Sequence, residues 1–337
     1  KWHIHGGLAL LGNIAPKSFY TVVAGWILYY FVSFLTGNTA SLGFVPMITD
    51  PGLNMTYMPI VVVLGFLILC FNLSGGLERV TKYMMVLLLF LMIVLAVRGF
   101  SLDGAKEGLS FYLKPNISKI NGNVVVGAMN QAFFTLSLGI GSMAIFGSYI
   151  GKDRTLMGES INILILDTFV AIVAGLIIFP ACSAFGVNPG EGPGLVFVTL
   201  PNIFNGMAGG RIWGTLFFIS MACAALTTVI AVFENIIAMC MDQFGWSRKK
   251  ACLINGIAMF FLALPCLLGF NALASFQPLG PGSGVLDLED YIVSNILLPA
   301  GSLIFVIFCN YKFVICIRHN LPFISIVIFI FKYVFSF

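Results

Sequence analysis

The sequence predicts an all-α protein, a helical bundle that crosses a lipid bilayer many times, and three observations lead to that fold class. Hydrophobic residues make up 59% of the 337-residue chain and charged residues only 9%, whereas a soluble domain carries about 25% charged residues. The apolar residues fall in runs of about 20, the length needed to cross a bilayer. The bilayer core offers no water to an unpaired backbone group, so these runs are expected to be helices.

The same composition excludes several classes of protein. So little charge is incompatible with a soluble enzyme or a disordered chain, and the net charge of +4 is too small and too dispersed to indicate a nucleic-acid partner. The eight cysteines are scattered through apolar runs, and we interpret them as small core residues. The lipid bilayer is therefore the expected surroundings, and a multi-pass protein of the cell membrane is the expected location.

The candidate membrane spans follow one another along the chain. They cover residues 15–36, 57–73, 80–97, 123–149, 160–186, 212–242, 250–270, 288–309 and 313–337. Lys and Arg concentrate in the loops on one side, including those with Arg79 and Lys82 and with Arg248, Lys249 and Lys250. Because basic loops stay inside, that side and the N-terminus are predicted to be cytoplasmic.

Segment 123–149 carries unusual residues for a simple span. Thr135, Ser137, Gly139 and Gly141 all lie at mid-membrane depth. One interpretation is a face of small residues that lets helices pack closely. The other is a broken helix, whose freed carbonyls and half-helix ends bind an ion or a substrate.

Two other spans carry polar groups. Thr227 and Thr228 follow Ala224 on an otherwise apolar helix, and threonine hydroxyls usually bond back to their own helix, which favours a structural role. Asp167 lies within 160–186 and is expected to be the sole buried carboxylate. A carboxylate at that depth costs about 3 kcal/mol, and no basic residue of the apolar segments can pair with it. A bound cation or a proton is its natural partner.

Several of these stretches resemble the neurotransmitter:sodium symporter family, in its bacterial sodium-dependent amino-acid transporter branch. The matching stretches run in the family's order across most of the chain: Ser18–Trp26, Gly76–Met85, Gly104–Pro115, Gln131–Gly139, Gly192–Pro201, Ala224–Thr228, and Asp290–Asn295 with Pro299. The resemblance implies a fold of five helices followed by five inverted ones. In that frame residues 1–310 form one transporter domain of helices three to ten, without the first two helices, and 311–337 is an apolar segment that does not align.

The resemblance also implies roles for individual residues. Those expected at the substrate are Tyr20, Phe134, Ser137, Ile140, Thr228 and Val232. Those expected at two sodium sites are Thr135 and Asp167 for the first and Ala224, Thr227 and Thr228 for the second. Gln131, Asp242 and Asp290 resemble gate residues. Sodium is a hard cation and prefers such oxygen ligands. The aliphatic Ile140 and Val232 favour a neutral, apolar amino acid, with plain core packing as their alternative role.

The resemblance therefore implies a sodium-coupled symporter that works by alternating access. Chloride is not expected, because Asp167 would itself supply the counter-charge to sodium. No nucleophile–base pair or metal cluster indicates an enzyme. Helix one supplies ligands to both sodium ions in the family, so the chain as written is not expected to transport alone. The alternative is a truncated, non-transporting membrane protein or a channel-like pore.

Overall fold

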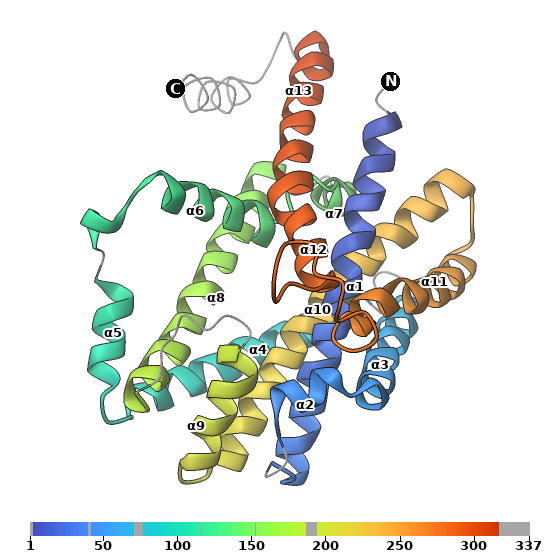
Figure 1. Cartoon of the computed structure of the whole chain (residues 1–337). Helices are drawn as coiled ribbons and strands as arrows, with labels where there is room; N and C mark the ends of the chain where they lie inside the picture. Colours follow the sequence, from blue (N-terminus) through green and yellow to red (C-terminus); the bar gives the residue numbers. More distant parts are fainter. Residues whose placement is uncertain are drawn as a thin grey trace.

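A computed structural model describes residues 3–39, 42–70, 77–114, 116–151, 153–186 and 194–316, and helices are the regular secondary structure of all these parts (Figure 1). Seven of the described helical segments are long and apolar enough to cross a bilayer: Ser18–Thr36, Pro51–Cys70, Glu78–Phe100, Leu156–Ala184, Gly210–Phe244, Arg248–Leu268 and Val285–Phe308. The prediction of an all-α, multi-span protein is confirmed.

The centre of the bundle is built from four long helices. Helix α1 (His3–Thr36) packs along α10 (Gly210–Phe244), while α3 (Pro51–Cys70) packs against α1 and α11 (Arg248–Leu268) (Figure 1). Aromatic side chains fill the α1–α10 contact: Tyr30 and Phe34 are fully buried and stack on Phe218, with ring centroids 5.1 and 5.4 Å apart. Spans in lipid associate through such close packing, since lipid tails are as apolar as the helices.

A second group of helices lies on the other flank of α10. Helix α4 (Leu77–Phe100) contacts both α10 and α8 (Leu156–Ala184), and the short α5 (Ala105–Leu113) lies along α8. Short elements complete the connections: α2 (Phe44–Thr49), η1 (Ile117–Lys119), η2 (Leu195–Thr199) and α9 (Leu200–Gly206). Cys70, Cys182, Cys223, Cys240, Cys252 and Cys266 are free thiols, and all of these except Cys70 are buried, in keeping with the interpretation as core residues.

The last described span is continuous but changes its winding. Helix α12 (Val285–Ile292) passes through a π-helical turn, η3 (Val293–Leu297), into α13 (Leu298–Cys316). Helix α6 (Gly122–Thr135) packs against both η3 and α13. The predicted boundary at residue 310 falls within α13 and stays a prediction. Residues 317–337 lie outside the described residues, as do Gly76, Pro115, Gly192 and Pro193 of the family motifs.

Predicted segment 123–149 is the one that does not form a single span. It divides into α6 and a short α7 (Ser142–Ser148), separated by turn residues 136–141. Figure 1 shows α6 and α7 as two separate short helices, with α6 near the upper end of α8. The candidate site lies at this interruption.

Candidate functional site

The interruption is made by three residues with left-handed backbone angles. Ser137 has φ 49°, Gly139 φ 87° and Gly141 φ 81°, and Ser137 is the one non-glycine residue with positive φ in the described chain. Gly139 also lies against α13: a Cβ added there would collide with the carbonyl oxygen of Leu298. The helix is thus broken, and a small residue also lets another backbone approach, so the structural part of both interpretations is confirmed. Binding of an ion or a substrate at the break stays a prediction.

A cavity of about 360 Å³ opens beside the break. It is lined from α1, α6, the turn, α7, α8 and α10 by Tyr20, Gln131, Phe134, Thr135, Ser137, Ser142, Met143, Phe146, Asp167, Thr228, Ala231, Val232 and Asn235. Eight of these were predicted at the site from sequence: Tyr20, Gln131, Phe134, Thr135, Ser137, Asp167, Thr228 and Val232. Residues from spans far apart in the sequence therefore face one space.

Thr135 and Asp167 are in direct contact. The Oγ1 hydroxyl of Thr135, the last residue of α6, donates a 2.7 Å hydrogen bond to Oδ1 of Asp167 in α8. The C-terminal end of a helix carries partial negative charge, so the end of α6 and the Asp167 carboxylate together make this wall of the cavity attractive to a cation. The second oxygen of Asp167 and the lone pairs of Thr135 are oxygen ligands suited to a hard ion.

Tyr20 and Phe134 stand next to each other in the lining of the cavity. Their ring centroids are 6.1 Å apart with an interplanar angle of 30°. Offset stacking at this separation is favourable between aromatic rings. The pair thus joins α1 to α6 across the cavity and gives that side an aromatic surface.

The two threonines of α10 bond within their own helix, as sequence reasoning expected of threonine. Thr227 Oγ1 donates to the carbonyls of Cys223 and Ala224 at 2.9 Å each, and Thr228 Oγ1 donates to Ala224 at 3.0 Å. Each hydroxyl keeps its lone pairs for a further acceptor role. Thr228 lines the cavity, whereas Ala224 and Thr227 are half-buried and are not part of its lining.

Three other predicted residues lie outside the cavity. Ile140 is buried and packs with Val293 and Leu298, which is the core-packing alternative. Asp290 accepts a 3.0 Å hydrogen bond from the hydroxyl of Ser294. Asp242 is exposed near the end of α10.

Sequence reasoning missed a polar network between α7 and α10. Asn235 Nδ2 donates a 2.6 Å hydrogen bond to Oγ of Ser142, the first residue of α7. Beyond the other end of α7, the Tyr149 hydroxyl donates to Glu234 Oε1 at 3.0 Å. Consecutive residues of α10 therefore hold the start and the end of the second half-helix.

The expectation that Asp167 is the sole buried carboxylate was wrong, because Asp167 is only half-buried and another carboxylate is more deeply buried. Glu234 is completely buried and forms a two-pronged ion pair with Arg248, at 3.0 Å for Nη1–Oε1 and 2.5 Å for Nη2–Oε2. Arg248 Nε also donates to the carbonyl of Leu69 at the end of α3, at 2.7 Å. A carboxylate inside an apolar run was the signal that could have identified Glu234, as it did Asp167.

Comparisons with known proteins agree on one family. A model of the sodium:neurotransmitter symporter family matches residues 38–274, more than half of the chain. An uncharacterized sodium-dependent transporter of Bacillus subtilis, YhdH, is 32% identical over 92% of this chain and 70% of its own length. One from Haemophilus influenzae is 33% identical over the same two shares. The crystal structure of MhsT in complex with L-phenylalanine is similar with a TM-score of 0.84 and 38% identity, covering 92% of this chain and 72% of that one.

Proposed function

The chain belongs to the sodium:neurotransmitter symporter family, and on that basis we propose that it imports a neutral, apolar amino acid together with sodium. The family comprises transporters and not enzymes, and the two bacterial relatives are sodium-dependent transporters. The chain is accordingly a multi-pass membrane protein of a sodium-coupled transport family. The substrate class, the number of ions, the mechanism and the residue roles form the proposal.

One observation carries the proposal: the cavity at the helix break collects polar groups from separate spans. Thr135 and Asp167 come from α6 and α8, Tyr20 from α1 and Thr228 from α10. Polar oxygen atoms at membrane depth cost free energy unless they contact a polar partner or a bound ion. Their convergence on one space, beside an interrupted helix, fits an ion and substrate site at the interface of the repeats.

The first sodium ion is assigned to Thr135 and Asp167. The hydroxyl of Thr135 points its hydrogen at Asp167 Oδ1, which leaves oxygen lone pairs of both groups for a cation. At 4 Å and an effective dielectric of 20, unit charges attract by about 4 kcal/mol. The carboxylate thereby offsets the charge of sodium, and we expect no requirement for chloride.

The second sodium ion is assigned to the carbonyl of Ala224 and the hydroxyls of Thr227 and Thr228. Both hydroxyls donate their hydrogens to carbonyls of the preceding turn, so their free lone pairs are what a ligand can meet. The two hydroxyl oxygens, beside the Ala224 carbonyl that already accepts from both of them, give a hard-cation surface without a second buried charge. This arrangement supports a weaker site than the one with Asp167.

A neutral, apolar amino acid fits the composition of the cavity. Phe134, Phe146 and Val232 supply apolar surface, and Asp167 is the one charged residue in its described lining. An acidic side chain would have no basic partner there, and a basic side chain would compete with sodium for Asp167. The Tyr20 hydroxyl is assigned to the substrate carboxylate, and Phe134 to a lid over the substrate. That MhsT was crystallised with L-phenylalanine supports the same substrate class.

Transport is proposed to proceed by alternating access, with Gln131, Asp290 and Asp242 at the gates. Each sodium ion that moves through 100 mV contributes about 2.3 kcal/mol. Two ions therefore support a substrate gradient of roughly three orders of magnitude, since 1.4 kcal/mol is tenfold. Tight coupling requires that the cavity close around substrate and ions together, which the stacked Tyr20–Phe134 pair is suited to do.

Equilibrium binding of tritiated L-phenylalanine to the purified protein, in a form that includes helix one of the family fold, tests the proposal. We expect saturable binding in sodium chloride that is lost when choline chloride replaces it. L-leucine should compete for this binding, whereas L-glutamate and L-lysine should not. Binding that ignores sodium, or that charged amino acids compete equally well, contradicts it. If the protein is instead a channel-like pore, single-channel currents should be recorded across a planar bilayer in the absence of any amino acid.

A further inference from the structure

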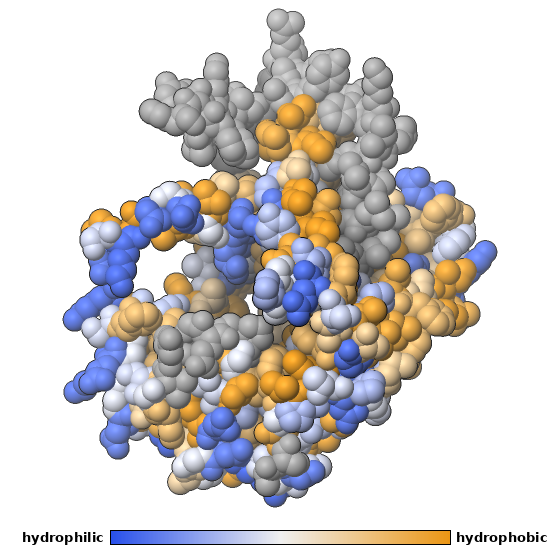
Figure 2. Space-filling view, in the orientation of Figure 1, coloured by the Kyte–Doolittle hydropathy of each residue, from blue (hydrophilic) through white to orange (hydrophobic). Residues whose placement is uncertain are grey.

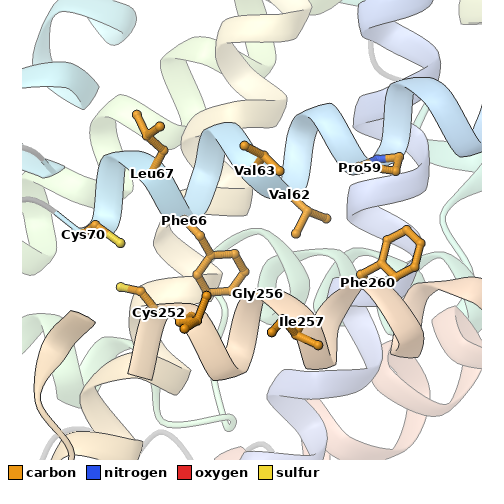
Figure 3. A pocket seen from close by; sticks show the side chains of 11 residues that line it. Pro59, Val62, Val63, Phe66, Leu67, Cys70, Cys252, Gly256, Ile257 and Phe260 are labelled. Atoms are coloured by element: carbon orange, nitrogen blue, oxygen red, sulfur yellow. The ribbon is translucent and has the colours of Figure 1, made fainter. Parts of the chain in front are cut away.

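A second cavity of about 440 Å³ lies between α3 and α11, away from the residues of the candidate site. Figure 3 shows the two helices side by side, with Val62, Phe66, Ile257 and Phe260 facing the space between them. The only polar side-chain atoms in its lining are the thiols of Cys70 and Cys252. A polar ligand would find no partner there, so the occupant of this α3–α11 groove must be apolar over its length.

The length of the groove matches one leaflet of a bilayer. On α3 it extends from Pro59 to Cys70, which at 1.5 Å per residue is about 16 Å. The hydrocarbon core of a bilayer is ~30 Å thick, so one leaflet measures about half of that. The rim is exposed, with Val63 at 60% and Leu253 at 67% of full exposure. Figure 2 shows hydrophobic residues covering much of the flank on the side of α11.

One end of the groove is basic. Arg248, the first residue of α11, donates to the carbonyl of Leu69 and so holds the start of α11 beside the end of α3. Lys249 follows it and is exposed. Lys249 precedes Cys252 and Leu253 of the groove by three and four residues, so it lies on the same face of α11. The two ion pairs found among the described residues do not involve Lys249.

The neighbouring Lys250 provides a contrast. Its ammonium group lies over the ring of Trp246, 5.3 Å from the ring centroid. It is one residue, and therefore about a quarter of a turn, away from the face that carries Lys249. A charged group positioned at the end of the groove by Lys249 would not be positioned by Lys250.

We propose that the α3–α11 groove binds an anionic phospholipid of the cytoplasmic leaflet, with an acyl chain between the helices and its phosphate on Lys249. The loops with Arg79, Lys82 and Arg248–Lys250 predict that this end of the groove faces the cytoplasm. The cytoplasmic leaflet is where anionic lipids give the membrane surface its negative potential. The groove thus matches a phospholipid in three features: its apolar lining, its one-leaflet length and the basic residue at its headgroup end.

Native mass spectrometry of the full chain in detergent tests the proposal, with phosphatidylglycerol and phosphatidylcholine of identical acyl chains. Phosphatidylglycerol should bind more tightly, and Lys249→Gln should weaken it about fivefold, the effect of one basic residue near an anionic headgroup. Lys250→Gln is the matched control and should change nothing. Gly256→Leu fills the groove, where an added Cβ meets the Phe66 ring at 3.4 Å, and should remove the tight phosphatidylglycerol adduct. Equal effects of the two lysine variants, or full binding by the Gly256→Leu protein, overturn the proposal.

The cysteines of the groove locate the bound lipid. Cys70 is exposed, and Figure 3 shows the Cys70 and Cys252 thiols facing each other across one end of the groove. Phosphatidylglycerol should slow the labelling of wild-type protein by pyrene maleimide, and a Cys70→Ser/Cys252→Ser variant should lose that protected fraction. Labelling that phosphatidylglycerol leaves unchanged overturns the assignment to this groove. A wild-type dimer that Gly256→Leu converts to monomer, without a change in lipid adducts, would overturn it in favour of a second copy of the chain.

Discussion

The hydroxyl of Thr135 donates a 2.7 Å hydrogen bond to the carboxylate of Asp167. This contact ties the end of the first half-helix, α6, to the separate span α8, and it holds the half-buried Asp167 carboxylate in the lining of the cavity. Because the negative end of α6 and the charge of Asp167 act on the same space, a cation there gains from both. The sodium-binding proposal depends on this pair more than on any other contact.

Asp167→Asn should turn a chloride-independent protein into one that responds to chloride. Wild-type amino-acid binding should be unchanged when gluconate replaces chloride, because Asp167 supplies the counter-charge. The variant should need at least tenfold more sodium, a loss of about 1.4 kcal/mol, and chloride should restore part of it. Sodium titrations in chloride and in gluconate measure both effects. Thr135→Ser, which keeps the hydroxyl, is the control, and an Asp167→Asn protein with wild-type sodium affinity contradicts the assignment.

Three glycines should rank in a fixed order when each is replaced by alanine. Gly127 lies within α6, where an added Cβ meets nothing within 4 Å, so Gly127→Ala should be neutral or stabilising by up to about 1 kcal/mol. Gly141→Ala should cost about 1–3 kcal/mol, because its φ of 81° is strained for alanine. Gly139→Ala adds a collision with the Leu298 backbone and should cost most. Thermal unfolding in detergent gives the order, and equal stability of the Gly139→Ala and Gly141→Ala proteins contradicts the close approach to α13.

Removing one partner of the buried Glu234–Arg248 ion pair, while the other stays, should be costly. Glu234→Gln leaves Arg248 without its carboxylate and should destabilise by about 3–5 kcal/mol. Tyr149→Phe removes one 3.0 Å hydrogen bond while the ion pair remains, and should cost about 1 kcal/mol. The double variant Glu234→Leu/Arg248→Leu should be more stable than Glu234→Gln, because apolar residues replace both charges. If the double variant unfolds at a lower temperature than the Glu234→Gln protein, the result contradicts a buried ion pair between Glu234 and Arg248.

Substitutions of Val232 and Ile140 should have different effects, on substrate selectivity and on stability respectively, although the sequence placed both residues at the substrate. Val232 lines the cavity, so Val232→Ala should enlarge it and shift competition toward bulkier amino acids by ~10-fold or more, the usual effect of a methylene in an apolar pocket. Ile140 is 6% exposed and packs on Val293 and Leu298. Ile140→Ala should instead lower stability by about 2–5 kcal/mol. Competition binding and thermal unfolding of both variants distinguish the two roles. A change in substrate selectivity with Ile140→Ala would contradict a role in core packing alone.

Sequence reasoning could predict the spans and most of the cavity, for identifiable physical reasons. A span is a long apolar run, so its signal is local and strong. Thr135, Ser137 and Asp167 stood out because polar groups at membrane depth are expensive. The break was one of the two interpretations that glycine and small residues at the centre of segment 123–149 left open.

The remaining features depend on packing that one span cannot encode. Ile140 and Val232 are both aliphatic. The path of the turn after Thr135 decides that Ile140 packs on α13, and the orientation of α10 decides that Val232 lines the cavity. The hydrogen bond from Asn235 to Ser142 requires the orientation of α7 relative to α10. Glu234 was accessible from sequence, but its partner Arg248 precedes the next apolar run and looks there like an ordinary loop residue.

Counting bound sodium with radiolabelled Na⁺, on purified protein that includes helix one of the family fold and with saturating L-phenylalanine, tests the central claim most directly. The account predicts two sodium ions for the wild-type protein and one for the Thr135→Val/Asp167→Asn variant. It predicts one for Thr227→Val/Thr228→Val as well, and none when the two pairs are combined. Saturable sodium binding that survives all four substitutions, or no saturable binding by the wild-type protein, would contradict it.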